Sequence, residues 1–118
     1  MKWTILYHEV FIPEFDALTT VVQDELLAMV GLLAIGGPSL GRPHFDTLSG
    51  SRHANMKELR FSADNGMWRV AFAFDPERQA MLLVAGDKSG VALKRFYKGL
   101  IARADRRFGE HLATLKGS

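Results

Sequence analysis

The stretch that decides the fold is MKELRFSADNGMWRVAFAFDPERQAMLLVAGDK, which runs from Met56 to Lys88. Apolar and β-branched runs alternate here with turn-forming residues, a pattern typical of consecutive antiparallel strands. It predicts three strands, Met56–Ser62, Met67–Phe74 and Ala80–Gly86. Asn65-Gly66 separates the first two strands and tolerates the positive φ that a two-residue hairpin turn requires. We therefore expect a three-strand meander.

The Asn65-Gly66 turn also predicts which residues share a face of the hairpin. It places Arg60 opposite Ala71, and side chains alternate between the two faces along each strand. One face is apolar: Leu59, Phe61, Trp68, Val70, Phe72 and Phe74. The other face carries Glu58, Arg60, Ser62, Arg69, Ala71 and Ala73. Because this second face has little apolar surface to bury, we expect it to be open, with its two arginines available to a ligand.

The flanking segments predict one more strand and two helices. Trp3–Tyr7 is rich in β-branched and aromatic residues, as strands are. Apolar residues three and four apart predict a helix from about Pro13 to Leu33, followed by a Gly- and Pro-rich loop. A similar spacing predicts a last helix from about Val91 to Leu115, with Leu93 in its buried stripe and Arg107 on a polar face. The order indicates an α+β fold.

The expected architecture is a single compact domain over residues 1–118. Its sheet is small and mainly antiparallel, with an N-terminal helical segment, a C-terminal helix, and the helices mostly on one face. No apolar run approaches the roughly 18–20 residues of a membrane span. Residues 1–41 hold one lysine against five acids, whereas residues 42–118 hold fourteen Lys or Arg against eight acids. The basic part of the chain favours a polyanionic partner, nucleic acid first.

Most catalytic motifs are absent from the sequence. The chain has no cysteine, which excludes disulfides and thiolate metal sites and fits a cytoplasmic protein. The four histidines lack metal-ligand spacing, so we expect no metal and no cofactor. The chemistry that remains is cationic: arginine forks on the hairpin suit a phosphate group. They could stabilise a pentacoordinate transition state in RNA, with the adjacent 2′-hydroxyl as nucleophile.

Each of these residues also has a purely structural interpretation. Arg60 can pair with Glu58 or Asp64 at the surface. Lys88 can be a solvated loop residue, His53 a hydrogen-bonding loop residue, and Tyr97 part of the core. Two arginines on one face repel each other unless an acid or an anion lies between them, and Glu58 can satisfy only part of both. If the face instead holds an RNA phosphate between the two arginines, it is strained when empty, and removal of either arginine leaves the melting temperature level or slightly higher.

Three runs of the sequence resemble the RelE/HigB superfamily of toxins from toxin–antitoxin systems, and more narrowly its phage Gp49-like HigB group. They are GPSLGRPHFDTLSGSRHANMKELRF, WRVAFAFDPERQAMLLVAGDKSG, and KRFYKGLIARADRRF with HL beyond it. The resemblance covers about Gly37 to Leu112. It implies the RelE-type microbial RNase fold and metal-independent cleavage of ribosome-bound mRNA, which inhibits translation. The implied partners are a HigA-like helix-turn-helix antitoxin, mRNA and the ribosome.

The resemblance also implies catalytic residues, because the family uses basic residues of the sheet and often an aromatic near the C-terminus. These map onto Arg60 in KELRF, Arg69 in WRVAF, Lys88 in AGDKSG and Tyr97 in KRFYK. Six more residues are predicted to bind RNA: Arg52, His53, Lys57, Lys94, Arg95 and Lys98. Two alternatives stay open. ParE-like toxins share the fold but poison DNA gyrase, and a non-catalytic nucleic-acid or protein-binding module would need no reaction at all.

Overall fold

The computed structural model describes residues 2–117, and over this range the chain forms three α-helices, a 3₁₀ turn and one five-stranded sheet. The elements are β1 (Thr4–Tyr7), α1 (Phe11–Asp16), α2 (Thr20–Gly36), η1 (Gly37–Ser39), β2 (Phe45–Thr47), β3 (Met56–Ala63), β4 (Gly66–Phe74), β5 (Gln79–Asp87) and α3 (Leu93–Gly117). The strand order is β1-β5-β4-β3-β2, with β1 parallel to β5 and the other pairs antiparallel. The predicted α+β fold with a mainly antiparallel sheet is confirmed.

The hairpin turn between β3 and β4 lies one residue earlier than expected. Its central residues are Asp64 and Asn65, with φ of 52° and 61°, the backbone of a type I′ turn. Gly66 belongs to β4, where a Cβ would lie 2.7 Å from Trp68 Nε1. The predicted pairing of Arg60 with Ala71 is therefore wrong, and Arg60 lies opposite Arg69. A shift by two residues keeps every side chain on its predicted face.

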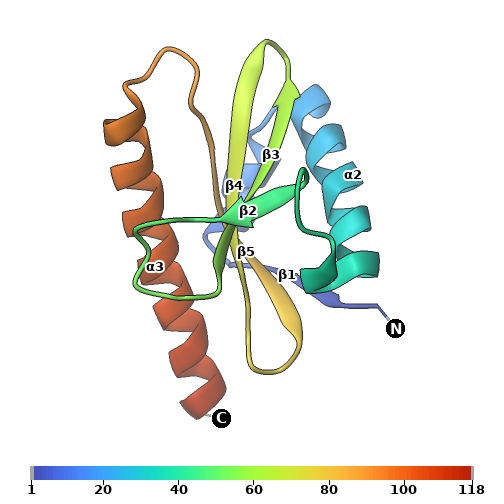
Figure 1. Cartoon of the computed structure of the whole chain (residues 1–118), viewed down its shortest axis with the longest axis vertical. Helices are drawn as coiled ribbons and strands as arrows, with labels where there is room; N and C mark the ends of the chain where they lie inside the picture. Colours follow the sequence, from blue (N-terminus) through green and yellow to red (C-terminus); the bar gives the residue numbers. More distant parts are fainter. Residues whose placement is uncertain (1, 118) are drawn as a thin grey trace.

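Helices cover both faces of the sheet, so the prediction that they lie mostly on one face is wrong (Figure 1). On one face α1 and α2 pack against the apolar residues of the hairpin, with Leu26 and Leu33 fully buried. On the other face α3 packs against Ala71 and Ala73, which are also fully buried. The small residues that suggested an open face instead make room for a helix. Only the end that carries Glu58 and Arg60 borders a surface groove.

The predicted N-terminal helix is two helices. Thr19 has extended backbone (φ −64°, ψ 155°), and its side chain accepts a hydrogen bond from the Val22 N–H, so α2 starts anew at Thr20. The segment Thr20–Ser39 has a mean hydropathy of 1.4 and is long and apolar enough, by length and composition alone, to cross a membrane. This differs from the sequence-based expectation that no apolar run approaches the length of a membrane span. In the fold, Leu26 and Leu33 of this helix pack on the sheet.

Helix α3 is fixed to the rest of the fold by Arg107, which the sequence analysis placed on a polar face. Arg107 is buried and donates to both carboxylate oxygens of Glu14, at 2.8 and 2.7 Å. It also donates to the Leu83 carbonyl at 2.7 Å. Leu83 lies in a β-bulge of β5, at the register shift opposite Ala71 and Phe72. At the other end of α3, Leu93 is 57% exposed and is not part of the buried stripe.

Replacement of Arg107 by methionine should lower the free energy of unfolding by about 1–3 kcal/mol, because the buried Leu83 carbonyl loses its donor. The hydrogen bond from Arg107 is the main cause that lowers the pKa of Glu14 below its ordinary value of 4.5. Glu14 therefore contributes stability above that pH, which is lost as the pH falls through its folded pKa. Urea unfolding at neutral and acidic pH measures both effects. The exposed neighbour Arg106, replaced by methionine, is the control, and equal losses in the two variants would contradict this role.

Candidate functional site

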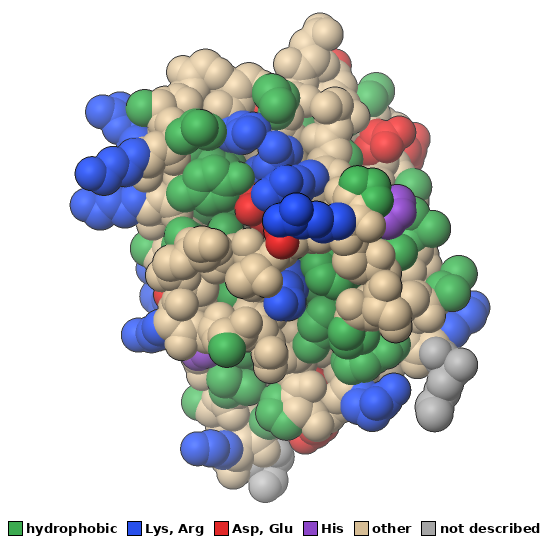
Figure 2. Space-filling view, in the orientation of Figure 1, with side chains coloured by type: hydrophobic (Ala, Val, Ile, Leu, Met, Phe, Trp, Pro, Cys, Tyr) green, Lys and Arg blue, Asp and Glu red, His purple; other side chains and the backbone are tan. Residues whose placement is uncertain are grey.

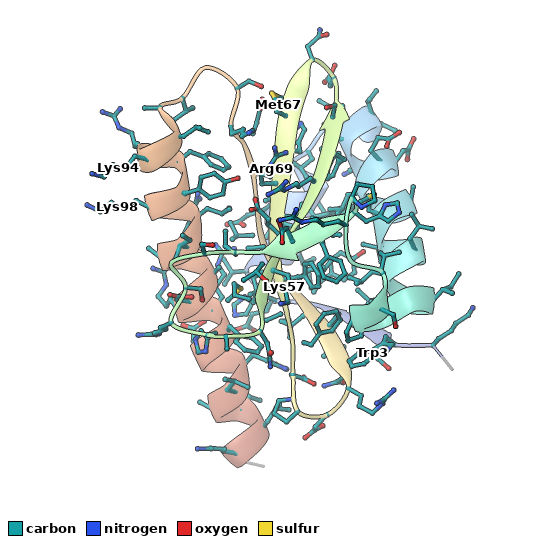
Figure 3. All side chains as sticks on the ribbon, in the orientation of Figure 1. Trp3, Lys57, Met67, Arg69, Lys94 and Lys98 are labelled. Atoms are coloured by element: carbon teal, nitrogen blue, oxygen red, sulfur yellow. The ribbon has the colours of Figure 1, made fainter. Side chains whose placement is uncertain are left out.

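The candidate site centres on two arginines that face each other across β3 and β4. Arg60 and Arg69 are direct neighbours in the register. The Arg60 N–H is bound on its other side to the His44 carbonyl, at 3.2 Å. The two arginines thus form a non-hydrogen-bonded pair, the kind in which opposed side chains come closest. In Figure 3, Arg69 lies on the upper half of the sheet, on the side that faces α3.

Glu58 lies between these arginines and the last helix, and it contacts every group around it. Its side chain is almost fully buried, at 4% exposure. Its Oε1 accepts a hydrogen bond from the Tyr97 hydroxyl at 2.8 Å and lies 3.6 Å from Arg69 Nε. Its Oε2 lies 3.4 Å from an Arg60 guanidinium nitrogen. One carboxylate therefore joins three of the four residues that were predicted to be catalytic.

Tyr97 faces the sheet from the first turns of α3. Burial raises the pKa of its hydroxyl, and the hydrogen bond and negative charge of Glu58 raise that pKa further. Arg69 acts in the opposite direction and lowers it. Tyr97 is therefore neutral at physiological pH. Its hydroxyl keeps its proton and donates a hydrogen bond to Glu58. The interpretation of Tyr97 as a core residue is correct for its ring, which packs against the buried residues between α3 and the sheet. It does not apply to the hydroxyl.

A groove of about 440 Å³ lies over this cluster, lined by Asp46, Thr47, Leu48, Ser49, Glu58, Arg60 and Tyr97. Asp46 of β2 stands at the rim. It pairs with Arg42 at 2.6 Å and lies 3.8 Å from Arg60, and the hydrogen bond from Arg42 is the main cause that lowers its pKa. Figure 2 shows the result as a group of Lys and Arg side chains with acidic side chains beside them. The groove is thus of mixed charge, with the Arg60 guanidinium between a carboxylate at its floor and another at its rim.

Lys88 extends the same face at the end of β5. Its backbone N–H donates to the Met67 carbonyl at 2.9 Å, which continues the ladder beyond Asp87. By alternation it shares a face with Gly86, which lies opposite Arg69. Gly86 is needed there, because a Cβ would lie 2.9 Å from the Phe96 ring. Within residues 2–117, no ion pair holds the half-buried Lys88 side chain.

The residues predicted to bind RNA do not form one surface. Lys94 and Lys98, with Arg95 between them, are exposed on the first turns of α3, and both lysines point away from the sheet (Figure 3). Lys57 lies on the opposite face of the sheet from Glu58, with its ammonium 3.2 Å from the Thr47 hydroxyl. The α3 group belongs to the same turns as Tyr97, which lines the groove, and Lys57 contacts Thr47, another lining residue.

Arg52 and His53 belong to the loop before β3, which contacts α3 further along the helix. Both have structural roles there. The Arg52 N–H donates to Asp105 at 3.2 Å, which holds the loop against the helix. The His53 ring packs edge-on against Phe108, with 5.0 Å between ring centroids. His53 Nε2 is buried without a hydrogen-bond partner among the described residues. This geometry favours the interpretation of His53 as a packing residue of the loop.

Metal chemistry has no support from the side chains that the structure places. Among residues 2–117, no group of three or more His, Asp or Glu side chains could hold a metal ion. The buried carboxylates of Asp75 and Glu58 already have partners. Asp75 lies 2.7 Å from His111, and Glu58 belongs to the cluster described above. The groove therefore offers guanidinium groups and a hydroxyl.

Comparison with known proteins assigns this chain to a family. The family model described as phage derived protein Gp49-like matches residues 13–109. The chain belongs to the Gp49-like family. HigB2 of Mycobacterium tuberculosis, a protein named as a toxin, is 48% identical over 102 residues, which are 86% of this chain and 50% of that protein. HigB3 of the same organism, also named as a toxin, is 43% identical over 87% of this chain and 88% of that protein.

The Gp49-like chain therefore spans about half the length of HigB2 and most of HigB3. A solved structure of a mutant of the E. coli toxin RelE in the free state aligns with a TM-score of 0.59. The alignment covers 86% of this chain and 96% of that chain at 12% identity, and at this identity it supports the fold alone. The resemblance to the RelE/HigB superfamily is confirmed.

Two acidic residues of the groove escaped the sequence analysis as site residues. Glu58 was considered only as a charge partner of the arginines, and Asp46 was assigned to a loop. Alternation along β3 did place Glu58 on the arginine face, so the signal for it was present. No such signal existed for Asp46, because the three-residue strand β2 that carries it is too short to recognise from a pattern.

Replacement of Arg69 by alanine should lower the free energy of unfolding by about 1–3 kcal/mol. The buried Glu58 carboxylate would then lose one of the two arginines that compensate its charge. This reverses the sequence-based prediction of a level or raised melting temperature. Arg60→Ala should cost less, since the Arg60 side chain is 44% exposed and such pairs contribute about 0–1 kcal/mol. Glu58→Gln added to Arg69→Ala should recover part of the loss. Urea unfolding of the wild type, Arg69→Ala, Glu58→Gln and their double variant tests this coupling, and additive losses would show that the two residues are uncoupled.

Proposed function

We propose that this chain is the toxin of a type II toxin–antitoxin system and that it cleaves mRNA without a metal ion. The observation that carries the proposal is the pair Arg60 and Arg69, set directly opposite each other on β3 and β4, with Arg60 and Tyr97 lining the adjacent groove. Two guanidinium forks on one side of a groove suit a phosphodiester and the extra charge of its transition state. The HigB relatives, both named as toxins, support the same reading.

The proposed reaction needs no nucleophile from the protein. The 2′-oxygen of the RNA attacks the adjacent phosphorus, and the new P–O2′ bond forms as the P–O5′ bond breaks. The 2′-hydroxyl gives up its proton, the departing 5′-oxygen gains one, and the products are a 2′,3′-cyclic phosphate and a 5′-hydroxyl. Arg60, Arg69 and Lys88 would hold the phosphate oxygens as negative charge develops. Tyr97, which keeps its proton, would donate a hydrogen bond within the groove.

The proposed partners follow from this reaction. An antitoxin must block the toxin in the cell that makes both, and we propose a HigA-like helix-turn-helix protein for that role. The proposed substrate is mRNA on the ribosome, which places the activity in the cytoplasm and explains inhibition of translation. Toxicity on expression, relieved by co-expression of the antitoxin, tests this part. A supercoiling assay with DNA gyrase separates it from the ParE-like alternative.

Arg69→Ala should lower the single-turnover rate of RNA cleavage about a hundred- to a thousand-fold, the usual effect when one transition-state contact is lost. Arg69→Lys should restore only part of the rate, because lysine keeps the charge but not the fork. The wild-type reaction should survive EDTA in a ribosome-free assay and end in a 2′,3′-cyclic phosphate. Full activity of Arg69→Ala, or a rate restored only by one divalent ion, would contradict the mechanism.

The exposed cations of α3 should add salt-dependent affinity for RNA. Each phosphate contact that is lost should flatten the slope of log K against log salt by about 0.7 for a single strand. The double variant Lys94→Ala with Arg95→Ala should therefore bind more weakly at low salt and with a shallower slope. Fluorescence anisotropy with a labelled RNA measures both quantities. Lys2→Ala with Lys116→Ala removes the same charge elsewhere, and an equal change there would mean that only net charge matters.

A further inference from the structure

Glu58 is an acid at the place where the proposed function puts a phosphate. It lines the groove, yet its carboxylate is almost fully buried. The burial of a charged group costs several kcal/mol unless good partners compensate it. The nearby packing does not require a carboxylate, since Ala71 opposite it and Met56 on the same face pack as apolar residues. The acid at this position therefore needs an explanation in the site itself.

The two oxygens of Glu58 have different neighbours. Oε1 faces the Tyr97 hydroxyl and Arg69 Nε, at 2.8 and 3.6 Å. Oε2 faces Arg60, at 3.4 Å. These groups come from three separate elements: α3, β4 and β3. The carboxylate is the only group within residues 2–117 that contacts all three of them.

Without Glu58, little else would hold these groups in place. The Tyr97 hydroxyl makes its one direct hydrogen bond within the described chain to Glu58. The Arg69 guanidinium donates from Nη1 to the Trp68 carbonyl at 2.8 Å, while its buried Nε has no hydrogen-bond partner among residues 2–117. Loss of Glu58 would therefore leave the polar atoms of both side chains with fewer partners that fix their rotamers.

We infer that Glu58 is a positioning residue for RNA cleavage: its carboxylate aligns the Tyr97 hydroxyl, Arg69 and Arg60 before the RNA binds. The inference rests on the proposed function. Glu58 does not take part in bond making; it acts through the three groups that it orients. Pre-organisation of this kind removes the entropic cost of ordering the groups during the reaction. The partly unsatisfied Arg69 keeps N–H donors for the phosphate.

A second explanation is that Glu58 only neutralises two close arginines. The two explanations predict opposite results. A mere neutraliser can be replaced by any acid that fits, and its removal should strengthen RNA binding without slowing cleavage. A positioning residue must keep its length and its oxygens in place, so both a neutral isostere and a shorter acid should slow cleavage. Glu58→Gln and Glu58→Asp make this distinction, and Glu58→Asp keeps the negative charge that compensates the buried Arg69.

The first measurement follows the tyrosines and does not depend on activity. The pKa values of Tyr97 and Tyr7 are read from the Cζ resonances of the labelled full-length protein, assigned with Tyr97→Phe. In Glu58→Gln the Tyr97 pKa should fall, because the charge of Glu58 is removed while the opposing effect of Arg69 remains. Tyr7, whose pKa is raised by burial alone, should not change. Asp46→Asn removes a carboxylate from the same groove without a contact to Tyr97 and should leave its pKa unchanged.

The second measurement separates cleavage from binding. Glu58→Gln and Glu58→Asp should each lower the single-turnover rate at saturating RNA about 100-fold, the usual effect of a small misplacement, with no loss of RNA affinity. Glu25→Gln, an exposed acid on α2, is the matched control and should keep the wild-type rate. A wild-type rate in Glu58→Asp, or an unchanged Tyr97 pKa in Glu58→Gln, would overturn the inference. If the wild type cleaves no RNA while the Tyr97 pKa still falls, the alignment by Glu58 stands and the proposed reaction is wrong.

Discussion

Two guanidinium groups directly opposite each other on neighbouring strands repel, and the architecture of the site follows from how that repulsion is resolved. The type I′ turn at Asp64 and Asn65 fixes the register that brings Arg60 and Arg69 together. Glu58, two residues before Arg60, lies on the same face and reaches both. Because the carboxylate is buried, its attraction for the arginines is little screened by water. A like-charge pair thus becomes a fixed cluster with its donors directed at a groove.

The second constraint is the close approach of α3 to the sheet. Ala71, Ala73 and Gly86 leave room for the helix, and Arg107 ties it to the β-bulge at Leu83 and to Glu14 of α1. This position of α3 brings the Tyr97 hydroxyl to Glu58, across 39 residues of sequence. The bulge of β5 and the site are therefore linked through α3, and also through Ala71, which lies beside the bulge and pairs with Glu58.

The basic residues of the chain serve different purposes according to their burial. Arg107 is structural and Arg69 belongs to the buried cluster, whereas Lys94, Arg95 and Lys98 are exposed. The excess of basic residues after position 41 therefore overstates the surface available to a polyanion. The groove itself carries acids at its floor and rim, Glu58 and Asp46, so a bound phosphate must compete with carboxylates for the guanidinium groups. Such competition favours a substrate whose charge grows in the transition state.

The sequence alone determined four of the five strands, the two faces of the hairpin and the family, because these depend on local periodicity, turn chemistry and motifs. The predicted faces of the hairpin were correct although the turn was placed one residue late. A two-residue shift in strand pairing keeps each side chain on the same face. The sequence could not reveal that α3 covers the second face. Small residues are equally consistent with an exposed strand and with a strand on which a helix packs. It also missed the burial of Arg107 and the part played by Glu58. Both depend on contacts between residues far apart in the chain, and only the tertiary structure brings those residues together.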